Sequence, residues 1–399
     1  MADPWLTIIG IGEDGPDGLP PASLAALQAA EIVTGAARHL ALLPELSAEL
    51  REWPVPWTEG VAGLLAMRGR RVVMLASGDP FWFGAGASLA PHLAPGEWRA
   101  MLAPSTFSLA AAAMGWRLED CACLGLHAAP LSRMRPHLAP GARLIVLLRD
   151  GQAVAEAAAY LDDQGFGASR VSVLESLGGP HQRITATTAA GFAVQPAHPV
   201  ALAVEVAGGP ALSQASGRAD ALFEHDGQIT KRPVRALTLS ALAPVAGELL
   251  WDIGAGSGSI GIEWLLCHPA NRAIAIEADG ARAARIERNA RAMGQDRLRI
   301  VNLPAPEGLA GLPRPDAVFI GGGLSDALLA ALEAQAKGAR LVANAVTIAS
   351  QSRLAGLHEL WGGEFLRVDL ARAARLGGGH TWRPALPIVQ FSTVIGGVA

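Results

Sequence analysis

The sequence predicts an α/β protein of two domains, and three observations support this prediction. The chain has 399 residues, more than one hydrophobic core usually organises. Short apolar runs alternate with helical patterns along both halves, as in α/β folds. The apolar run from Leu249 to Ile253 leads directly into a glycine-rich turn and then into a helical pattern, which together form a strand–turn–helix unit.

In the first half, short runs of Val, Ile, Leu and Ala predict strands, and longer alanine-rich segments predict helices. The predicted elements, in order, are strand 6–9, helix 22–30, strand 32–34, strand 71–76, a helix beginning within 81–93, a strand end at 101–103, helix 109–114, strand 143–148, helix 153–161, and strands 171–174 and 200–206. Two turns follow strands directly, Ser77 to Pro80 and Pro104 to Ser108, where open sheets bind ligands. Asp79 is a candidate catalytic acid, although an aspartate in a turn more often orders that turn.

In the second half, Pro233 marks the start of a helix, and strand and helix patterns then alternate. The predicted elements, in order, are helix 234–242, strand 249–253, helix 259–267, strand 273–276, helix 281–293, strand 298–302, strand 317–320, helix 326–335, strand 339–344, helix 348–357, and strands 365–370 and 387–394. This order predicts a Rossmann-like, seven-stranded sheet. Residues 209–226 lack periodicity, so they are predicted to connect domains 1–208 and 227–399.

The most informative motif is the glycine turn after the first strand of the second domain, with Gly254, Gly256 and Gly258 at alternate positions. Residues without a Cβ bring backbone N–H groups and a helix N-terminus close to a ligand. Glu277 follows the next strand, where a carboxylate can bind ribose hydroxyls. Dinucleotides and S-adenosylmethionine both use this design. Asp252 favours S-adenosylmethionine, because a carboxylate repels pyrophosphate and can either order the turn or face a cationic ligand. A tight turn that binds no ligand is the simpler alternative.

Composition indicates a globular protein and argues against some partners. Hydrophobic residues make up 51% of the chain and charged residues 17%, which is unlike a disordered protein. The formal net charge of −4 argues against a nucleic-acid-binding protein. Only two lysines occur, Lys231 and Lys337, so nearly all positive charge is arginine. Codon bias in a GC-rich genome and anion binding explain the abundance of arginine equally well.

The three cysteines are too few for a disulfide framework or a zinc site, which favours a reduced, cytoplasmic compartment. The N-terminus lacks the basic and apolar regions of a signal peptide, and no stretch has the pattern of a membrane span. His127, His181 and His198 have no partner at metal-ligand spacing. We therefore expect no metal, and each histidine is predicted to lie on the surface or in the core.

Four motifs of the first half resemble the successive motifs of the tetrapyrrole methylase family: TIIGIGEDGPDGL, ASGDPFWFGAGASL, APSTFSLAAAAMGW and ESLGGPHQRI. They are most similar to the cobalamin-pathway branch that methylates the C5 meso carbon of precorrin-6. The resemblance implies two α/β subdomains that enclose S-adenosylmethionine, with the cofactor held at Gly78, Asp79, Ser105 and Thr106. Many members read G-x-G-P-G-D after the first strand, whereas this chain has Glu13-Asp14-Gly15-Pro16, a departure that concerns the substrate position.

Four motifs of the second half, GQITKRPVRALTL, DIGAGSGSIGIEW, AVFIGGGL and ANAV, resemble the decarboxylating C15-methyltransferases of the same pathway. By matching motif, the implied cofactor contacts are Thr230, Gly254, Ala255, Gly256, Ser257, Gly258, Glu277 and Ala305. The two halves in this order are similar to the fused, bifunctional methyltransferases of cobalamin biosynthesis. The resemblance implies two S-adenosylmethionine sites, C5 methylation by residues 1–208, and C15 methylation by residues 227–399. The second domain would also remove the carboxyl group of the ring C acetate of precorrin-6Y (6B), giving precorrin-8.

The implied chemistry depends mainly on positioning and on excluding water, because the meso carbon is an electron-rich nucleophile. A substrate with several carboxylates predicts arginines around the pocket. The candidates are Arg232, Arg235, Arg372, Arg375 and Arg383, although each alone is more often a surface residue. The glycine-rich segment within 372–383 is predicted to be a flexible loop that closes over the ring. His380 in this loop is a candidate proton relay, and Arg232 and Arg383 are further catalytic candidates.

The motifs leave other functions open. The chain could methylate another small molecule, a protein or RNA, or it could be a non-catalytic S-adenosylmethionine sensor. An Asn/Asp-Pro-Pro-aromatic turn, typical of DNA amino-methyltransferases, is absent after the 317–320 strand, where Gly321 to Gly323 stand instead. We expect a tetrapyrrole substrate, no nucleic-acid or membrane partner, and a homo-oligomer.

Overall fold

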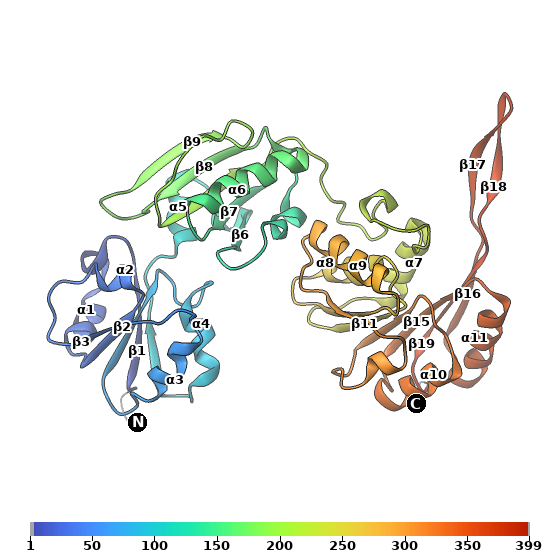
Figure 1. The fold of residues 1–399 in the computed structure, drawn as a ribbon, viewed down its shortest axis with the longest axis horizontal. Coiled ribbons are helices and arrows are strands. Elements are labelled where there is room, and N and C mark those ends of the chain that lie inside the picture. Colours follow the sequence, from blue (N-terminus) through green and yellow to red (C-terminus); the bar gives the residue numbers. More distant parts are fainter. Residues whose placement is uncertain (1–3, 398–399) are drawn as a thin grey trace. The chain divides into compact units, whose positions relative to one another are not determined.

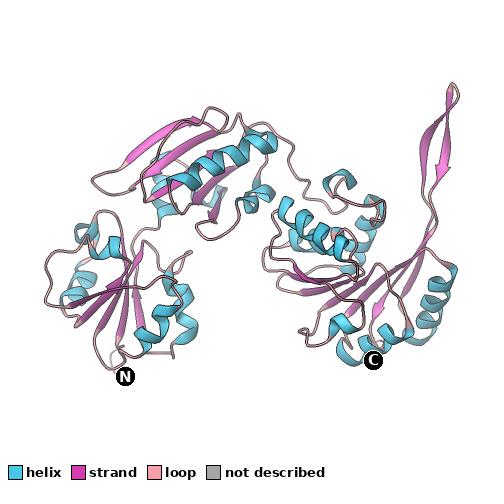
Figure 2. Cartoon of the chain, in the orientation of Figure 1, coloured by secondary structure: helices cyan, strands magenta, loops and turns pink. Residues whose placement is uncertain are grey.

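The chain is an α/β protein, as predicted, and a computed structural model describes residues 4–397 (Figure 1, Figure 2). It divides into two compact units, of which the first comprises Met1–Leu131 and His137–Ala211. The second comprises Ser132–Pro136 and Leu212–Ala399. The outer limits of the predicted domains, residues 1–3 and 398–399, lie outside the described residues. None of the helices in the described part combines the length and apolarity needed to cross a lipid bilayer.

The first sheet of the first unit is parallel, with the strand order β3-β2-β4-β1-β5. Its strands are β1 (Leu6–Ile11), β2 (Ile32–Gly35), β3 (Glu49–Glu52), β4 (Val72–Ser77) and β5 (Trp98–Met101), and its helices are α1 (Pro21–Gln28), α2 (Ala37–Leu40), α3 (Glu59–Leu65) and α4 (Ala85–Leu89). The central strands are buried, which explains their continuous apolar runs. β4 becomes exposed only at its last residue, Ser77, where it leaves the sheet at the carboxyl edge.

The second sheet of the first unit is mixed, with the order β6-β7-β10-β8-β9. Its elements are β6 (Cys121–Gly125), β7 (Arg143–Leu147), β8 (Arg170–Glu175), β9 (Arg183–Thr188), β10 (Val200–Glu205), α5 (Thr106–Met114) and α6 (Gly151–Leu161). Helix α5 begins at Thr106, earlier than the predicted residue 109. The reason is that Ser105 is its N-cap, whose Oγ accepts a hydrogen bond from Ser108 N at 3.1 Å.

Three strands of the first unit, β3, β6 and β9, escaped prediction, and all three lie at sheet edges. β3 reads Glu-Leu-Arg-Glu and is exposed throughout, and β9 is mostly exposed. Edge strands bury little apolar surface and often carry charges, so β3 and β9 lack the apolar run on which the prediction relied. β6 reads Cys-Ala-Cys-Leu-Gly and is half-buried, and its apolar run was missed.

The second unit contains the predicted seven-stranded sheet, with the order β13-β12-β11-β14-β15-β19-β16. Its elements are α7 (Arg232–Leu242), β11 (Leu249–Ile253), α8 (Ser259–Cys267), β12 (Arg272–Ile276), α9 (Gly280–Ala292), β13 (Arg299–Val301), β14 (Ala317–Ile320), α10 (Asp326–Gln335), β15 (Arg340–Ala345), α11 (Ile348–Trp361), β16 (Glu364–Val368) and β19 (Ile388–Val394). β11 to β15 are parallel, and β19 runs antiparallel between β15 and β16. The strand order reverses at β11, where such sheets bind ligands at their carboxyl ends.

The segment predicted as a flexible loop within residues 372–383 is instead a two-stranded antiparallel ribbon. β17 (Ala371–Leu376) pairs with β18 (Gly379–Pro384), and the ribbon projects away from the sheet (Figure 1). Arg372 lies opposite Arg383, and Arg375 lies opposite His380. Gly377 and Gly378 therefore form the turn of a hairpin, a possibility that composition alone did not distinguish from a loop.

The second unit begins at Leu212, so most of residues 209–226 pack as part of it. Leu212 and Phe223 are buried in its core. The fully buried Glu263 of α8 accepts hydrogen bonds from the backbone N of Gly217 at 2.7 Å and of Arg218 at 2.9 Å. These contacts fasten the segment before α7 onto α8.

Arg235 of α7 is at the centre of this attachment. It is fully buried, and its Nε donates to Glu263 Oε1 at 2.7 Å. Its two Nη atoms donate to the carbonyl oxygens of Thr230 and Arg218. Arg235, a predicted substrate contact, is therefore a structural residue that holds two points of the segment before α7.

We expect Arg235→Met to lower the free energy of unfolding of the second unit by about 3–5 kcal/mol, because it removes the guanidinium nearest to the buried Glu263 carboxylate and leaves only the more distant Arg218, at 3.6 Å, as a described counter-charge. Hydrogen exchange of the α7 and α8 amides measures this. The matched control is Arg288→Met, which removes an exposed pair with Glu224 and should cost about 1 kcal/mol or less. Equal effects of the two substitutions would contradict the role of Arg235.

Candidate active sites

The second unit has a cavity of about 790 Å³ at the carboxyl ends of its parallel strands. Its walls come from the turns after β11, β12 and β14, the end of β15, and the segment before α7. The predicted cofactor residues that line it are Thr230, Gly254, Ala255, Gly256, Ser257, Glu277 and Ala305. Gly258 does not line the cavity and is instead the N-cap of α8.

The Glu277 carboxylate holds the glycine turn in place. Gly256 N donates to Glu277 Oε2 at 2.8 Å, and Asp279 N donates to Glu277 Oε1 at 3.0 Å. Gly254 has a φ of +65°, and a Cβ there would lie 2.8 Å from the backbone N of Gly322, so the turn requires glycine. A carboxylate oxygen can accept more than one hydrogen bond. Glu277 can therefore hold the turn and also bind a ligand hydroxyl.

Asp252 does not line the cavity, which decides between its two predicted roles. Its Oδ2 accepts a hydrogen bond from Gly261 N at 2.9 Å, in the first turn of α8. The N-cap residue, Gly258, has no side chain that could do this. Burial raises the pKa of Asp252 to about 7; the Gly261 hydrogen bond opposes this rise and the nearby Glu277 adds to it. Asp252 thus orders the helix start and does not face a ligand.

The basic residues of the second cavity differ from those predicted. Within the described residues, neither cavity is lined by any of the six predicted candidates, which are Arg232, Arg235, Arg372, Arg375, Arg383 and His380. Lys231 and Arg282 line the second cavity instead. Arg282 Nε donates to Asp226 Oδ2 at 2.9 Å. One feature of the sequence could have pointed to Lys231, which is one of only two lysines in the chain.

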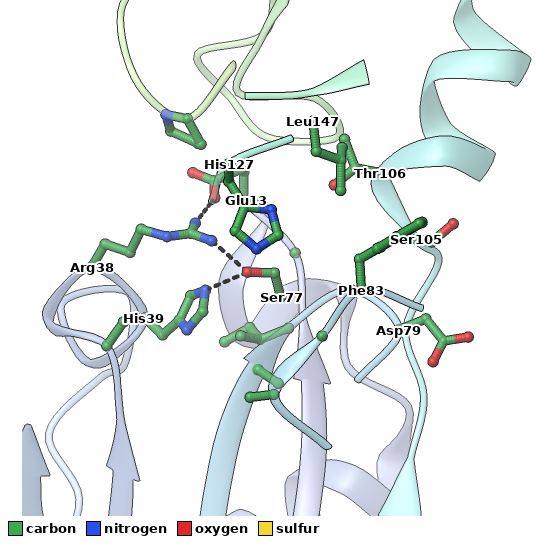
Figure 3. Close-up of a pocket in the computed structure, with 18 of the residues that line it drawn as sticks. Glu13, Arg38, His39, Ser77, Asp79, Phe83, Ser105, Thr106, His127 and Leu147 are labelled. Carbon is green, nitrogen blue, oxygen red and sulfur yellow. Dashed lines mark hydrogen bonds and ion pairs between the residues drawn. The ribbon is translucent and has the colours of Figure 1, made fainter. Parts of the chain in front are cut away.

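The first unit has a separate cavity of about 570 Å³. The predicted cofactor residues Gly78, Asp79, Ser105 and Thr106 all line it. Figure 3 shows the last three of them. The turn after β4 packs tightly on β1, since a Cβ on Gly10 would lie 1.8 Å from the carbonyl oxygen of Gly78. This close approach fixes the turn that carries Gly78 and Asp79.

Asp79 has the turn-ordering role that the sequence favours. Its Oδ1 accepts a hydrogen bond from Phe81 N at 2.8 Å, which closes the turn. Nearby, Trp82 and Phe83 pack against Phe107 with ring centroids 5.0 and 5.7 Å apart. All three aromatic residues line the cavity, so its walls are largely apolar.

A polar network lies on the side of the first cavity opposite Asp79 and Ser105 (Figure 3). Arg38 Nη1 pairs with Glu13 Oε1 at 2.6 Å, and Arg38 Nη2 donates to Ser77 Oγ at 2.5 Å. His39 Nε2 lies 3.2 Å from the same Ser77 Oγ. Burial, with the Arg38 charge second, lowers the pKa of His39 to about 3, so this imidazole is neutral at pH 7.

Two of the histidines predicted to lie on the surface or in the core are exposed and also line the first cavity. These are His127 and His198, whereas His181 is exposed elsewhere. Burial and the nearby Arg38 lower the pKa of His198. Topology brings these histidines to the cavity from the second sheet, which their spacing in the sequence did not reveal. Within the described residues, no cluster of His, Cys, Asp and Glu could hold a metal ion.

Two protein families match the chain, one for each half. The family described as Tetrapyrrole (Corrin/Porphyrin) Methylases matches residues 5–193. The family described as Precorrin methyltransferase domain matches residues 221–395. The chain is also 51% identical to a Sinorhizobium protein named precorrin-6Y C(5,15)-methyltransferase (decarboxylating), over 98% of this chain and 97% of that protein. The chain belongs to the precorrin-6Y C(5,15)-methyltransferase family.

Relatives of this family that are named for one activity match less than half of the chain. A Pyrobaculum calidifontis protein, named probable cobalt-precorrin-6B C(15)-methyltransferase (decarboxylating), is 36% identical over 40% of this chain and 87% of its own length. A Salmonella typhimurium protein, named cobalt-precorrin-7 C(5)-methyltransferase, is 34% identical over 22% of this chain and 43% of its own length. The resemblance of the first half to tetrapyrrole methylases and that of the second half to decarboxylating C15-methyltransferases are therefore both confirmed, and one family combines them.

The raised pKa of Asp252 predicts a pH dependence of stability. The pKa of about 7 lies above the ordinary 3.8, so the folded chain holds the proton more tightly than the unfolded chain. This stabilisation is complete below about pH 4 and is lost as the pH rises through about 7. We expect Asp252→Asn, which keeps the acceptor for Gly261 N, to gain about 1.4 kcal/mol relative to wild type per pH unit between about pH 4 and about pH 7, and no more above that pH, where Asp252 is ionised in both states.

Hydrogen exchange of the α8 amides between about pH 5 and about pH 8, corrected for intrinsic exchange rates, measures this difference. Parallel pH profiles for Asp252→Asn and the wild-type chain would show that Asp252 is ionised throughout this range.

Proposed function

We propose that the chain methylates precorrin-6Y (6B) at C5 and C15 with S-adenosylmethionine and removes one carboxyl group as CO2, in cobalamin biosynthesis. One observation carries this proposal: the chain matches a protein named for this reaction at 51% identity along nearly its whole length. Two separate cavities, one in each unit, agree with two methyl transfers.

The first unit carries out C5 methylation in this proposal, and the second carries out C15 methylation and decarboxylation. Each unit contains a different fold and its own cavity. Relatives named for only a C5 or only a C15 activity match parts of the chain, which supports a division of labour. The carboxyl group lost is that of the ring C acetate, and the product is precorrin-8.

Methyltransferases of this family use S-adenosylmethionine, and we assign one molecule to each cavity. In the second cavity, the glycine turn and Glu277 receive the nucleoside end, and Thr230 and Ser257 supply further polar contacts. The Ser257 Oγ is buried and has no partner among the described residues, so it is available to a ligand. In the first cavity, the backbone around Gly78 and Ser105 holds the cofactor.

The exposed surface beside each cavity suits a large, flat, partly apolar substrate. Leu303, Val346 and Leu386 line the second cavity and are 50%, 54% and 76% exposed. Trp82 and Phe83 line the first cavity and are 36% and 50% exposed. Exposed apolar groups at a cavity commonly mark a binding surface, and the rim of a tetrapyrrole would cover them.

We also propose that the chain forms a homo-oligomer in the cytoplasm. An isolated two-stranded hairpin is only marginally stable in water, yet the β17–β18 ribbon is exposed along almost its whole length. Its Leu376 and Trp382 are 68% and 73% exposed. Packing against another copy of the chain would bury these side chains.

Two reciprocal substitutions test the division of labour. Gly256→Arg places a long side chain in the second cavity, where a Cβ meets only the Gln228 carbonyl oxygen at 3.7 Å. We expect C15 methylation and CO2 release to fall at least about 100-fold, because the methyl donor is displaced, while C5 methylation continues. Thr106→Arg, in the first cavity, should have the opposite effect.

Mass spectrometry of products from a reduced precorrin-6 and isotope-labelled S-adenosylmethionine separates the activities. Each variant serves as the folding control for the other, since one activity should survive. Loss of both methylations in either variant would contradict separate sites. A wild-type chain that binds the donor but transfers no methyl group to any precorrin would favour the sensor or another substrate.

A further inference from the structure

The decarboxylation in the proposed function requires a proton donor. When the carboxylate leaves as CO2, the electron pair of the broken C–C bond passes into the conjugated macrocycle. The methylene carbon must then gain a proton to become a methyl group. A side chain that binds the carboxylate and can release a proton near it would serve both needs.

Three ionisable residues line the second cavity among the described residues: Lys231, Glu277 and Arg282. Glu277 already accepts hydrogen bonds from two backbone N–H groups, and as a carboxylate it repels the leaving group. Arg282 is paired with Asp226 at 2.9 Å, and a guanidinium does not release a proton in proteins. Lys231 alone combines a positive charge with a transferable proton.

The backbone of Lys231 is held in place, whereas its side-chain ammonium is exposed. It is the N-cap of α7, and its carbonyl oxygen accepts a hydrogen bond from Arg235 N at 2.8 Å. The preceding carbonyl, of Thr230, is held by the buried Arg235 side chain. In contrast, the exposed Nζ has one described contact, to the Gly227 carbonyl oxygen at 3.4 Å. An ammonium has three donors, so Lys231 can reach a ligand without breaking the fold.

The identity of this residue supports the same role. Lysine and arginine together number 32, and only two of them are lysines. A lysine in the cavity wall of such a chain indicates a role that arginine does not fill. Arginine binds a carboxylate more firmly, whereas lysine can also give up its proton.

We propose that Lys231 binds the carboxylate that is lost and then donates a proton to the carbon from which CO2 departs. The C–C bond breaks, its electron pair enters the macrocycle, and an Nζ–H proton forms the new C–H bond as the electrons return. The neutral amine regains a proton from water. Once the macrocycle covers them, the apolar side chains that line the same cavity, Phe319, Val346, Leu386 and Ile388, exclude water from the carboxylate and so favour its loss.

Substitutions of Lys231 in the full-length chain test this role, which rests on the proposed function. We expect Lys231→Met to lower kcat for CO2 release about 100-fold and to raise KM for the precorrin. Lys231→Arg should keep KM near its wild-type value but not restore kcat, because arginine binds the carboxylate without releasing a proton. Lys337→Met removes the other lysine, which lines neither cavity, and should leave both values unchanged.

C5 methylation, followed in the same reaction, is the internal control for folding and substrate quality. Normal CO2 release by Lys231→Met would overturn the proposal, and normal kcat in Lys231→Arg would overturn the proton-donor role. If His380→Ala slowed CO2 release and Lys231→Met did not, His380 of the β17–β18 ribbon would be the proton donor instead. A wild-type chain that releases no CO2 from a precorrin would refute the proposed function itself, whereas the other outcomes concern Lys231 only.

Discussion

The second cavity depends on one hydrogen bond, from Gly256 N to the Glu277 carboxylate at 2.8 Å. It ties the turn after β11 to the residue after β12, so that two neighbouring strands present one surface to a ligand. Beneath this surface, Asp252 completes the first turn of α8. The buried Glu277 carboxylate beside the turn suits a cationic sulfonium better than the phosphates of a dinucleotide.

Much of the second unit could be predicted because its signals are local. β11, α8, β14 and α10 have the predicted bounds, since each is a continuous apolar or periodic segment flanked by glycine or a capping residue. The cofactor turn is equally local, because glycine spacing and the acid after the next strand lie within one strand–helix–strand unit. Edge strands such as β3 and β9 lack this apolar signal and were not predicted.

The substrate side of each site could not be predicted in the same way, because distant segments build it. The expected substrate carboxylates suggested arginines as substrate contacts. Arg235 is instead fully buried and has a structural role, and Arg375 lies opposite His380 in the β17–β18 ribbon. His127 and His198 reach the first cavity only through the arrangement of the second sheet. Lys231 is adjacent in sequence to a predicted candidate, Arg232, and only the structure shows that Lys231 lines the cavity and Arg232 does not.

Two methyl-donor sites in one chain, built on unrelated sheets, are central to the proposed function. Both cavities are lined by backbone turns at the carboxyl ends of parallel strands, and both lie beside exposed apolar side chains. Calorimetric titration of the full-length chain with S-adenosylhomocysteine tests this arrangement most directly. We expect two molecules to bind per chain; saturation at one molecule per chain would contradict the existence of a site in each unit.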